Sequence, residues 1–465
     1  MTARHPAQGV PSNRPVAGTG RPVMVTIALI SLMLPVSFNI GSWLMSPSRA
    51  LFLVMLPIWM ISLFRGQYGK VNYIDVLVLL YMAWRTFVPF IHNPQVALQY
   101  AGSNSIIFLG GYMAARASIR SPEDFRWMAK VLGAFVIFSF PFAVYEATTG
   151  DFVIPHLFEQ IPGITSVKDV NYQRRLGMDR VQFVFVHPIH YGLFCSMAVS
   201  AFFLGLKGVI SGFWRWIGTG LILGCCLMSV SSGPFLAALA QIGLTMWGFM
   251  FRKKEKRWKI FGGLFAAFYA IIEIGSNRPG IVALISLLSF SSSTANVRFI
   301  LFEYGMQQVY RTPLIGIGFR RLPLPPWMTG SLDNFWLAIA VIFGVPAFLF
   351  LFSAVVFGLI GIGRRKFKPG GALDNTRLAW AITLISITLT LSTVFIWTEV
   401  ASLVMFMIGS GVFLLHAQET EDGAAPVPVD TGRQPMGYSR YAPEMSRNSP
   451  AEPLPPGRRA AKGKT

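Results

Sequence analysis

The sequence predicts an all-α polytopic membrane protein, from its composition and from the spacing of its apolar segments. Of its 465 residues, 53% are hydrophobic and only 13% are charged, whereas soluble domains carry about 25% charged residues. Many apolar segments are long enough to cross a hydrocarbon layer of about 30 Å, and short basic connectors separate them. The chain is therefore too poor in charge to be a water-soluble globule, and its length does not convert into a count of soluble domains.

The apolar segments predict twelve membrane-spanning helices. In chain order they cover residues 23–45, 49–64, 74–92, 96–115, 129–148, 187–206, 216–230, 233–251, 259–275, 334–362, 377–396 and 399–416. The first segment is too long to be a cleaved signal peptide, so we expect it to remain as the first span. An even number of spans places both ends of the chain on one side of the membrane.

Basic residues identify that side as the cytoplasm. They concentrate in alternate connectors, such as 252–257 and 364–366, and the positive-inside rule assigns such connectors to the cytoplasm. Segments 1–22 and 417–465 are therefore expected to be cytoplasmic. The second of these is rich in Pro, Gly, Ala and charge, so we expect it to be disordered.

The same topology explains a net charge of +20, from 40 Lys and Arg against 20 Asp and Glu. Cytoplasmic basic connectors face anionic headgroups, so membrane lipids are expected partners. Nucleic acid is not expected, because no nucleic-acid motif is present. The three cysteines, Cys195, Cys225 and Cys226, all lie in apolar segments, which predicts small core residues rather than disulfides or metal ligands.

Two long loops on the outer face, about 149–186 and 276–333, are the expected place of function, because loops on a rigid scaffold carry most functional residues. Within the second loop, Pro279 to Phe290 is apolar but too short to span, which favours an interfacial or re-entrant helix. Residues 297–310 show the apolar spacing of an amphipathic helix.

The first loop is basic on the side where positive charge is disfavoured. Four basic residues occur within thirteen positions: Lys168, Arg174, Arg175 and Arg180. Guanidinium groups pair bidentately with phosphate, so the cluster suits a lipid phosphate or pyrophosphate. The alternative is that these residues pair with Asp169, Asp179 or lipid headgroups.

His187 and His190 follow, three positions apart at the start of a span. A metal site is not predicted, because no Cys, Asp or Glu lies beside them and two histidines do not complete a site. A hydrogen-bonding role at the membrane interface is favoured instead, and either ring is a candidate proton acceptor near neutral pH.

Arg85 lies inside the third predicted span, far from either end. Charges at such positions are rare and usually functional. We expect it to pair with a carboxylate such as Glu146 or Glu399, or to reach a lipid phosphate from within the bundle.

The order of several short motifs resembles one family. They are His187-Pro188-Ile189 with Gly192, Ser231-Ser232-Gly233, Arg298 ahead of Pro313-Leu314-Ile315-Gly316-Ile317-Gly318, and Asp333-Asn334 with Leu337 and Gly344. In this order and loop placement the chain resembles the bacterial O-antigen ligase and O-antigen polymerase superfamily of integral membrane glycosyltransferases.

The resemblance implies a multi-pass protein of the bacterial inner membrane that transfers a glycan on the periplasmic face. The implied donor is an undecaprenyl-pyrophosphate-linked glycan, transferred with inversion and without metal or cofactor. The implied pyrophosphate and sugar ligands are outer-loop arginines, which here are Arg175, Arg180, Arg278 and Arg298. Arg180 and Arg298 are the two to which we assign catalytic charge stabilisation, because a pyrophosphate leaving group needs preplaced positive charge.

The pair Asp333-Asn334 favours the polymerase branch, because ligases of this superfamily typically carry a His-Asn pair at that place. Asp333 is a candidate base for an attacking sugar hydroxyl, and Asn334 is a candidate substrate ligand with His190 and Arg85. The alternative is that Asp333 caps the following helix. The sequence leaves the base open among Asp333, His187 and His190.

The sequence therefore predicts a polymerase that joins lipid-linked repeat units into a surface or secreted polysaccharide. The resemblance suggests a flippase and a chain-length regulator as protein partners. The alternative within the class is a ligase that moves the glycan to a lipid A core. From other classes, a lipid or sugar transporter lacks support from repeated halves, and a purely structural scaffold leaves the arginines unexplained.

Overall fold

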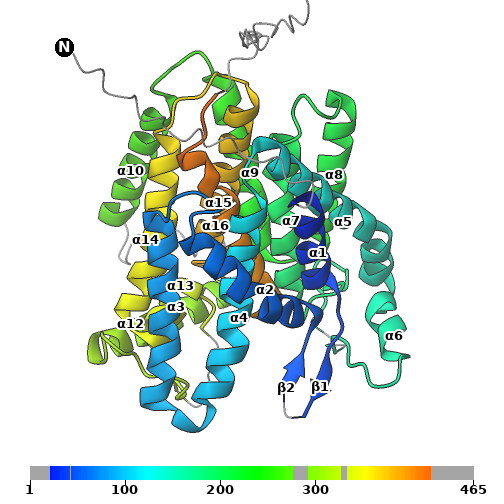
Figure 1. Cartoon of the computed structure of the whole chain (residues 1–465), viewed down its shortest axis with the longest axis vertical. Helices are drawn as coiled ribbons and strands as arrows, with labels where there is room; N and C mark the ends of the chain where they lie inside the picture. The colour runs from blue at the N-terminus through cyan, green and yellow to red at the C-terminus, as the bar shows by residue number, and fades with distance from the viewer. Residues whose placement is uncertain are drawn as a thin grey trace, which may run out of the picture. The chain divides into compact units, whose positions relative to one another are not determined.

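A computed structural model describes residues 21–41, 43–168, 170, 172–275, 292–325 and 332–419 (Figure 1). Segment 1–20, almost all of the predicted tail 417–465, the predicted re-entrant segment 279–290 and Arg278 lie outside these residues. The described chain belongs to one compact unit that ends at Glu419.

The described elements are helical apart from one short hairpin. They are α1 (Arg21–Met33), β1 (Phe38–Ile40), β2 (Trp43–Met45), α2 (Pro47–Phe64), α3 (Tyr73–His92), α4 (Pro94–Ser118), α5 (Pro122–Thr149), α6 (Val153–Glu159), α7 (Pro188–Phe203), α8 (Gly212–Met228), α9 (Ser232–Met250), α10 (Arg257–Gly275), α12 (Ser292–Arg311), α13 (Phe335–Phe343), α14 (Val345–Gly363), α15 (Ala372–Thr390), α16 (Thr398–Ser410) and the 3₁₀ turn η1 (Val412–Leu415). Proline at the first position starts several of them, because its fixed φ suits a helix start and its missing N–H is not needed there.

The chain is an all-α polytopic membrane protein, as predicted. Among the described residues, seven helical segments are long and apolar enough to cross a membrane: 47–64, 73–92, 122–149, 232–250, 257–275, 345–363 and 398–415. Each of the twelve predicted spans overlaps a helix, but the number of crossings stays a prediction.

The first predicted span, 23–45, is wrong in its second half. α1 ends at Met33, and residues 38–45 form an antiparallel hairpin with Phe38 opposite Met45. Pro35 ends the helix because it carries no N–H, and Gly41 starts the hairpin turn at φ +60°. The apolar composition of the segment is compatible with either structure, so it does not distinguish them.

The predicted span 334–362 is also not one helix. Gly344 separates α13 from α14 at φ +86°, a conformation that L side chains rarely adopt. The Pro313–Gly318 segment fills the break: Val345 N–H donates to the Pro313 carbonyl at 2.7 Å, and Ile317 N–H donates to the Val341 carbonyl at 2.9 Å. A motif of the second loop is therefore joined to the broken helix through backbone hydrogen bonds.

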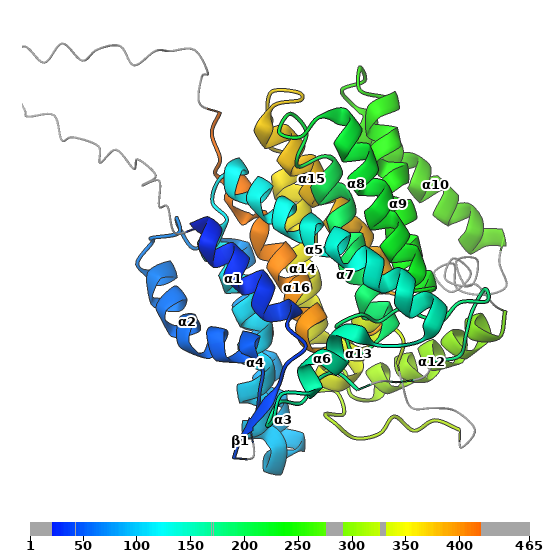
Figure 2. The same ribbon diagram turned by 90° about the vertical axis from the view of Figure 1, so that its right-hand side faces the viewer.

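The loop elements gather at one end of the bundle. α6, α12 and the β1–β2 hairpin lie at the lower end in Figure 1 and again in Figure 2, whereas the basic turns 251–256 and 364–371 lie at the upper end. The helix predicted at 297–310 lies within α12, which is longer and covers Ser292–Arg311. The first loop contains α6, which the sequence did not predict.

α16 is largely enclosed by other helices, since every residue from Val400 to Ser410 is buried. Small residues permit this: a side chain at Gly111 of α4 would meet the backbone and hydroxyl of Ser402, and one at Gly409 would meet the backbone of Tyr112. The segment before α16 therefore emerges from the middle of the bundle, at the end where the two outer loops lie.

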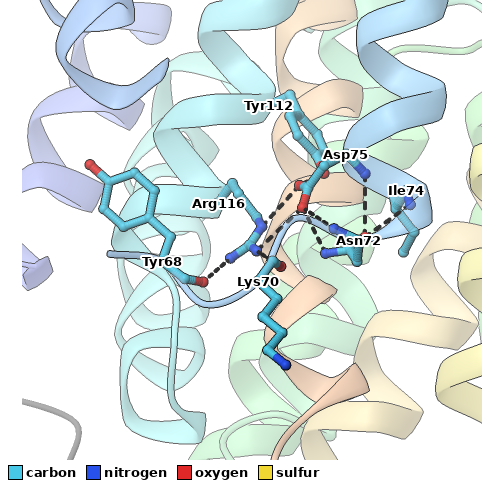
Figure 3. A network of polar contacts seen from close by, with 7 residues as sticks. All are labelled: Tyr68, Lys70, Asn72, Ile74, Asp75, Tyr112 and Arg116. Atoms are coloured by element: carbon cyan, nitrogen blue, oxygen red, sulfur yellow. Dashed lines mark hydrogen bonds and ion pairs between the residues drawn. The ribbon is translucent and has the colours of Figure 1, made fainter. Parts of the chain in front are cut away.

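A buried ion pair fixes α3 to α4 at the opposite end (Figure 3). Arg116 Nε donates to Asp75 Oδ1 at 3.0 Å, and the Tyr112 hydroxyl donates to the same oxygen at 2.6 Å. The side chains of Arg116 and Asp75 are only 3% and 0% exposed. Asn72 completes a capping box with Asp75, and Arg116 also donates to the Tyr68 carbonyl. The charges are thus fully partnered, as a buried pair requires.

Candidate functional site

The end of the first outer loop is held by a buried carboxylate. Glu146, in the last turn of α5, is 3% exposed and accepts hydrogen bonds from Gln182 N–H at 2.6 Å and Phe183 N–H at 3.1 Å. Phe183 has φ +53°, which is a strained conformation for an aromatic residue. Val181 N–H donates to the Met228 carbonyl at 3.2 Å. These contacts fix the backbone on both sides of Arg180.

Arg180 lies beside the N-terminus of α9. Its Nη2 donates to the Ser231 hydroxyl at 2.9 Å, and its guanidinium carbon lies 5.5 Å from the ring centre of Tyr172. α9 has no side-chain cap on its first N–H groups, and a helix N-terminus with free N–H groups attracts anions. Burial lowers the pKa of Arg180 to about 10, with the charge of Arg175 acting in the same direction. An anion bound here would oppose both effects.

The other basic residues of this loop differ in their partners. Arg174 forms a bidentate pair with Asp179, with distances of 2.9 and 2.7 Å, so the predicted alternative of pairing with an acidic neighbour holds for Arg174. Lys168 and Arg175 are exposed. Asp169 lies outside the described residues.

Arg298 of α12, in the second loop, is influenced by the charge of a first-loop residue. Its pKa is lowered by burial, raised by the charge of Asp333 and lowered again by the charge of Arg175. Because Arg175 also acts on Arg180, the charge of this first-loop residue reaches both Arg180 and Arg298. Arg175 therefore acts on both predicted catalytic arginines, whereas Arg278 is outside the described residues.

Arg298, Asp333, Asn334 and Ser392 line a small hollow with a cavity volume of about 20 Å³. Asn334 caps α13, since its Oδ1 accepts from Leu337 N–H at 3.0 Å. The alternative in which Asp333 is the helix cap is therefore wrong, and Asp333 lines the hollow together with Arg298.

A second, larger hollow lies on the first loop. Its empty volume is about 970 Å³ and it is open to solvent. It is lined mainly by polar groups, including Tyr172, Arg174, Asp179 and Arg180. Arg180 thus stands between this hollow and the start of α9.

His187 is the N-cap of α7. Its Nδ1 accepts from Ile189 N–H at 3.0 Å, so we assign the ring proton of the neutral form to Nε2. The unprotonated nitrogen of the neutral ring is therefore engaged in the cap.

His190 is fully buried, and its ring lies edge-on to Trp397 with ring centres 4.1 Å apart. The centres of the His187 and His190 rings are 6.1 Å apart. Within the described ranges, no three His, Cys, Asp or Glu side chains converge as a metal site would require.

Arg85 has different partners from those predicted. Its Nη atoms donate to the hydroxyls of Tyr81 at 2.8 Å and Tyr100 at 2.9 Å, and its guanidinium lies 3.8 Å from the ring centre of Phe108. The predicted carboxylate pairing is wrong, because its polar partners are phenols and Glu146 holds the first loop instead. Tyr100 packs on Phe319 at 4.3 Å, so Arg85 supports the segment that fills the break at Gly344.

The sequence reasoning missed the connector before α16. The predicted span 377–396 ends early, because α15 stops at Thr390 and residues 391–397 are not helical. Phe335 N–H donates to the Leu391 carbonyl at 2.9 Å and the Val394 carbonyl at 3.0 Å, which places Ser392 beside Asp333. The only signal in the sequence was a polar and aromatic stretch, Ser392 to Thr398, between two apolar runs.

Comparison with known proteins gives one family. Residues 217–352 match a family model described as O-antigen ligase. The match runs from α8 into α14 and contains Ser231, Arg298 and Asp333, whereas Arg180 precedes it. No curated protein matches the chain. The chain therefore carries an O-antigen ligase family domain over residues 217–352, which confirms its resemblance to the O-antigen ligase and polymerase superfamily.

Proposed function

We propose that the protein is a polymerase that joins undecaprenyl-pyrophosphate-linked oligosaccharide units into a surface or secreted polysaccharide, at the periplasmic face of the bacterial inner membrane. The observation that carries the proposal is that Arg298 and Asp333 line one hollow together with Ser392. Arg180 lies nearby at the start of α9, since it donates to Ser231, and Gly233 of that helix accepts a hydrogen bond from Thr390, just before Ser392. This arrangement supplies positive charge for a pyrophosphate and an acceptor for a proton at neighbouring positions.

The positive groups would stabilise the leaving group. As the bond between the anomeric carbon and the pyrophosphate oxygen breaks, its electron pair stays on the pyrophosphate. Arg180, which donates to Ser231 beside the N-terminus of α9, would bind the anion together with the first N–H groups of that helix, and Arg298 would add charge from the second loop. Preplaced donors of this kind lower the barrier, because they need not reorganise during the reaction.

Asp333 is the base that the geometry favours. It would take the proton from a sugar hydroxyl of the second unit, whose oxygen attacks the anomeric carbon from the face opposite the pyrophosphate and inverts it. His187 is less suited, since its unprotonated nitrogen accepts from Ile189 N–H. His190 is less suited because it is fully buried. Asn334 supports Asp333 by fixing the start of α13.

The position of the basic turns supports the assigned orientation. They lie at the end of the bundle opposite to α6 and α12 (Figure 1), and the positive-inside rule then assigns the outer loops and the arginine cluster to the periplasm. Both chain ends would be cytoplasmic. A flippase that delivers the lipid-linked units and a chain-length regulator are the protein partners that this role requires.

The second candidate is a ligase that transfers the glycan to a lipid A core, which the description of the matching family favours. It would use the same pyrophosphate ligands. The two functions differ in the acceptor, so the products distinguish them.

The test is the size profile of cell-surface and secreted glycan in a deletion strain complemented with wild type, Arg180→Ala, Arg298→Ala or Asp333→Asn. Arg320→Ala is the matched control, because Arg320 is an exposed arginine of the second loop. Each variant is first checked for normal membrane insertion. We expect the three site variants to lose long chains while single repeat units persist, and the control to retain them.

Accumulation of long lipid-linked chains, with loss of all lipid A-attached repeats, would instead identify a ligase. An unchanged profile in the deletion strain would refute both functions and favour a transporter.

A further inference from the structure

Aromatic rings form a row that begins at Arg180. The guanidinium of Arg180 lies over Tyr172, whose ring centre is 4.7 Å from that of His187. The His187 ring is followed by Trp397 at 6.1 Å, and Trp397 stacks on Phe395 at 5.9 Å with an angle of 26°. The row therefore leads from the first loop to the connector 391–397, which also carries Ser392 of the smaller hollow. The row thus connects the larger hollow, which Tyr172 and Arg180 line, with the smaller hollow, which Ser392 lines.

Trp397 is the member of this row whose exposure needs an explanation. It is 37% exposed, although the ring packed against it, His190, is fully buried. Tryptophan is often exposed at a membrane interface because its ring anchors in lipid headgroups. Trp214 and Trp216 of α8 fit that role, with exposures of 60% and 67%.

Trp397 does not fit the lipid-anchor role. It directly precedes α16, whose residues from Val400 onward are enclosed by other helices. Its ring lies against His187, which in turn lies against Tyr172 of the larger hollow, so we infer that the exposed part of Trp397 faces the outer loops rather than lipid. Its position is also fixed, by the rings of His190 and Phe395 and by the strained φ of +50° at Thr398. The exposed part of the ring is thus a rigid apolar surface in a polar site.

A sugar ring is the ligand that such a surface recognises. Pyranoses present apolar C–H faces and polar hydroxyl edges, so a flat aromatic ring covers a face while neighbouring polar groups bind the edge. We propose that Trp397, with Tyr172 at the other end of the row, forms a subsite for a sugar ring of the lipid-linked glycan close to its pyrophosphate. This proposal rests on the proposed function, because that function brings a glycan to Arg180.

The test measures affinity for two lipids with purified full-length protein in nanodiscs. One lipid is undecaprenyl pyrophosphate without sugar, and the other is the undecaprenyl-pyrophosphate-linked oligosaccharide extracted from the deletion strain. The proteins are wild type, Trp397→Ala, Trp397→Phe and, as a matched control, Trp214→Ala. Thermal unfolding without ligand checks that each variant is folded.

We expect wild type and the control to bind the glycan-linked lipid more tightly than the bare lipid. Trp397→Ala should bind the bare lipid as wild type does but lose about 10-fold in affinity for the glycan-linked lipid. Trp397→Phe should retain most of the difference, because a flat ring remains.

The subsite is refuted if Trp397→Ala binds both lipids as wild type does, if it weakens both equally, or if wild type does not prefer the glycan-linked lipid. A wild-type protein that binds neither lipid would refute the proposed function itself, which separates the two failures.

Discussion

Replacement of Glu146 by Gln tests whether the first loop is positioned from beneath the site. The carboxylate accepts hydrogen bonds from Gln182 and Phe183 N–H groups and is almost fully buried. A hydrogen bond to a charged group contributes about 1.5–3 kcal/mol and one between neutral groups about 0.5–1.5 kcal/mol. Loss of the charge at two bonds therefore costs roughly 2–3 kcal/mol. The added amide NH₂ also cannot accept from a backbone N–H.

The lost stabilisation in Glu146→Gln should appear first as local opening of the first outer loop. A loss of about 2–3 kcal/mol raises the open population of the loop roughly 30–150-fold, since Phe183 is held at a strained φ of +53°. We expect hydrogen exchange of the amides of residues 181–185 to accelerate by about that factor. Glycan polymerisation should fall with it, because Arg180 loses its fixed position. The control is Glu159→Gln, an exposed carboxylate of the same loop.

Unchanged exchange in Glu146→Gln would refute the idea that this carboxylate holds the loop. Accelerated exchange with wild-type polymerisation would show that the position of Arg180 is not critical, and would weaken its assignment as a pyrophosphate ligand.

Two further predictions concern the ion pairs. Arg116→Met should destabilise the protein by about 3–5 kcal/mol in reversible unfolding in detergent, because it leaves Asp75 buried and unpaired. The double variant with Asp75→Asn should recover part of the lost stability. Full additivity of the two changes in unfolding free energy would contradict a direct pair. The hydrogen bond from Arg174 lowers the pKa of Asp179 below its ordinary value. A depressed pKa stabilises the folded loop above the ordinary value of about 3.9, and this contribution is lost as the pH falls through the lower folded-state pKa. The protection factors of the loop amides, which correct for the intrinsic pH dependence of exchange, should therefore be insensitive to this pair between pH 8 and 5 and should fall below about pH 4, whereas Arg174→Ala should remove that fall.

The sequence predicted the helices where composition and local stereochemistry suffice. Long apolar runs form α2, α5, α9 and α10, and prolines at positions 47, 94, 122 and 188 start helices. The prediction of a helix was wrong where an apolar segment can form either a helix or a turn. The hairpin at 38–45 and the break at Gly344 are as apolar as a helix, and each depends on a backbone turn at positive φ. The break is further defined by Pro313, which lies far away in the sequence.

The sequence also allowed a prediction of the type of ligand at the candidate site. Basic residues in an outer loop indicated an anion partner, because the positive-inside rule disfavours guanidinium groups on that side unless they bind a negative group. Their individual partners were not readable. Arg174 and Arg180 stand close in the chain, yet one is paired with Asp179 and the other lies against Ser231 at the start of α9.

Sequence alone determined that this protein lies in a membrane, and it predicted the side that each loop faces and the residue types of the candidate site, because hydrophobicity and charge are properties of composition. Tertiary structure decided that Asn334 and not Asp333 caps α13, that Arg85 binds phenols and that Trp397 lies against His187 and His190. Each of these depends on which groups meet across helices, since a buried polar group must find its partner wherever the fold places one.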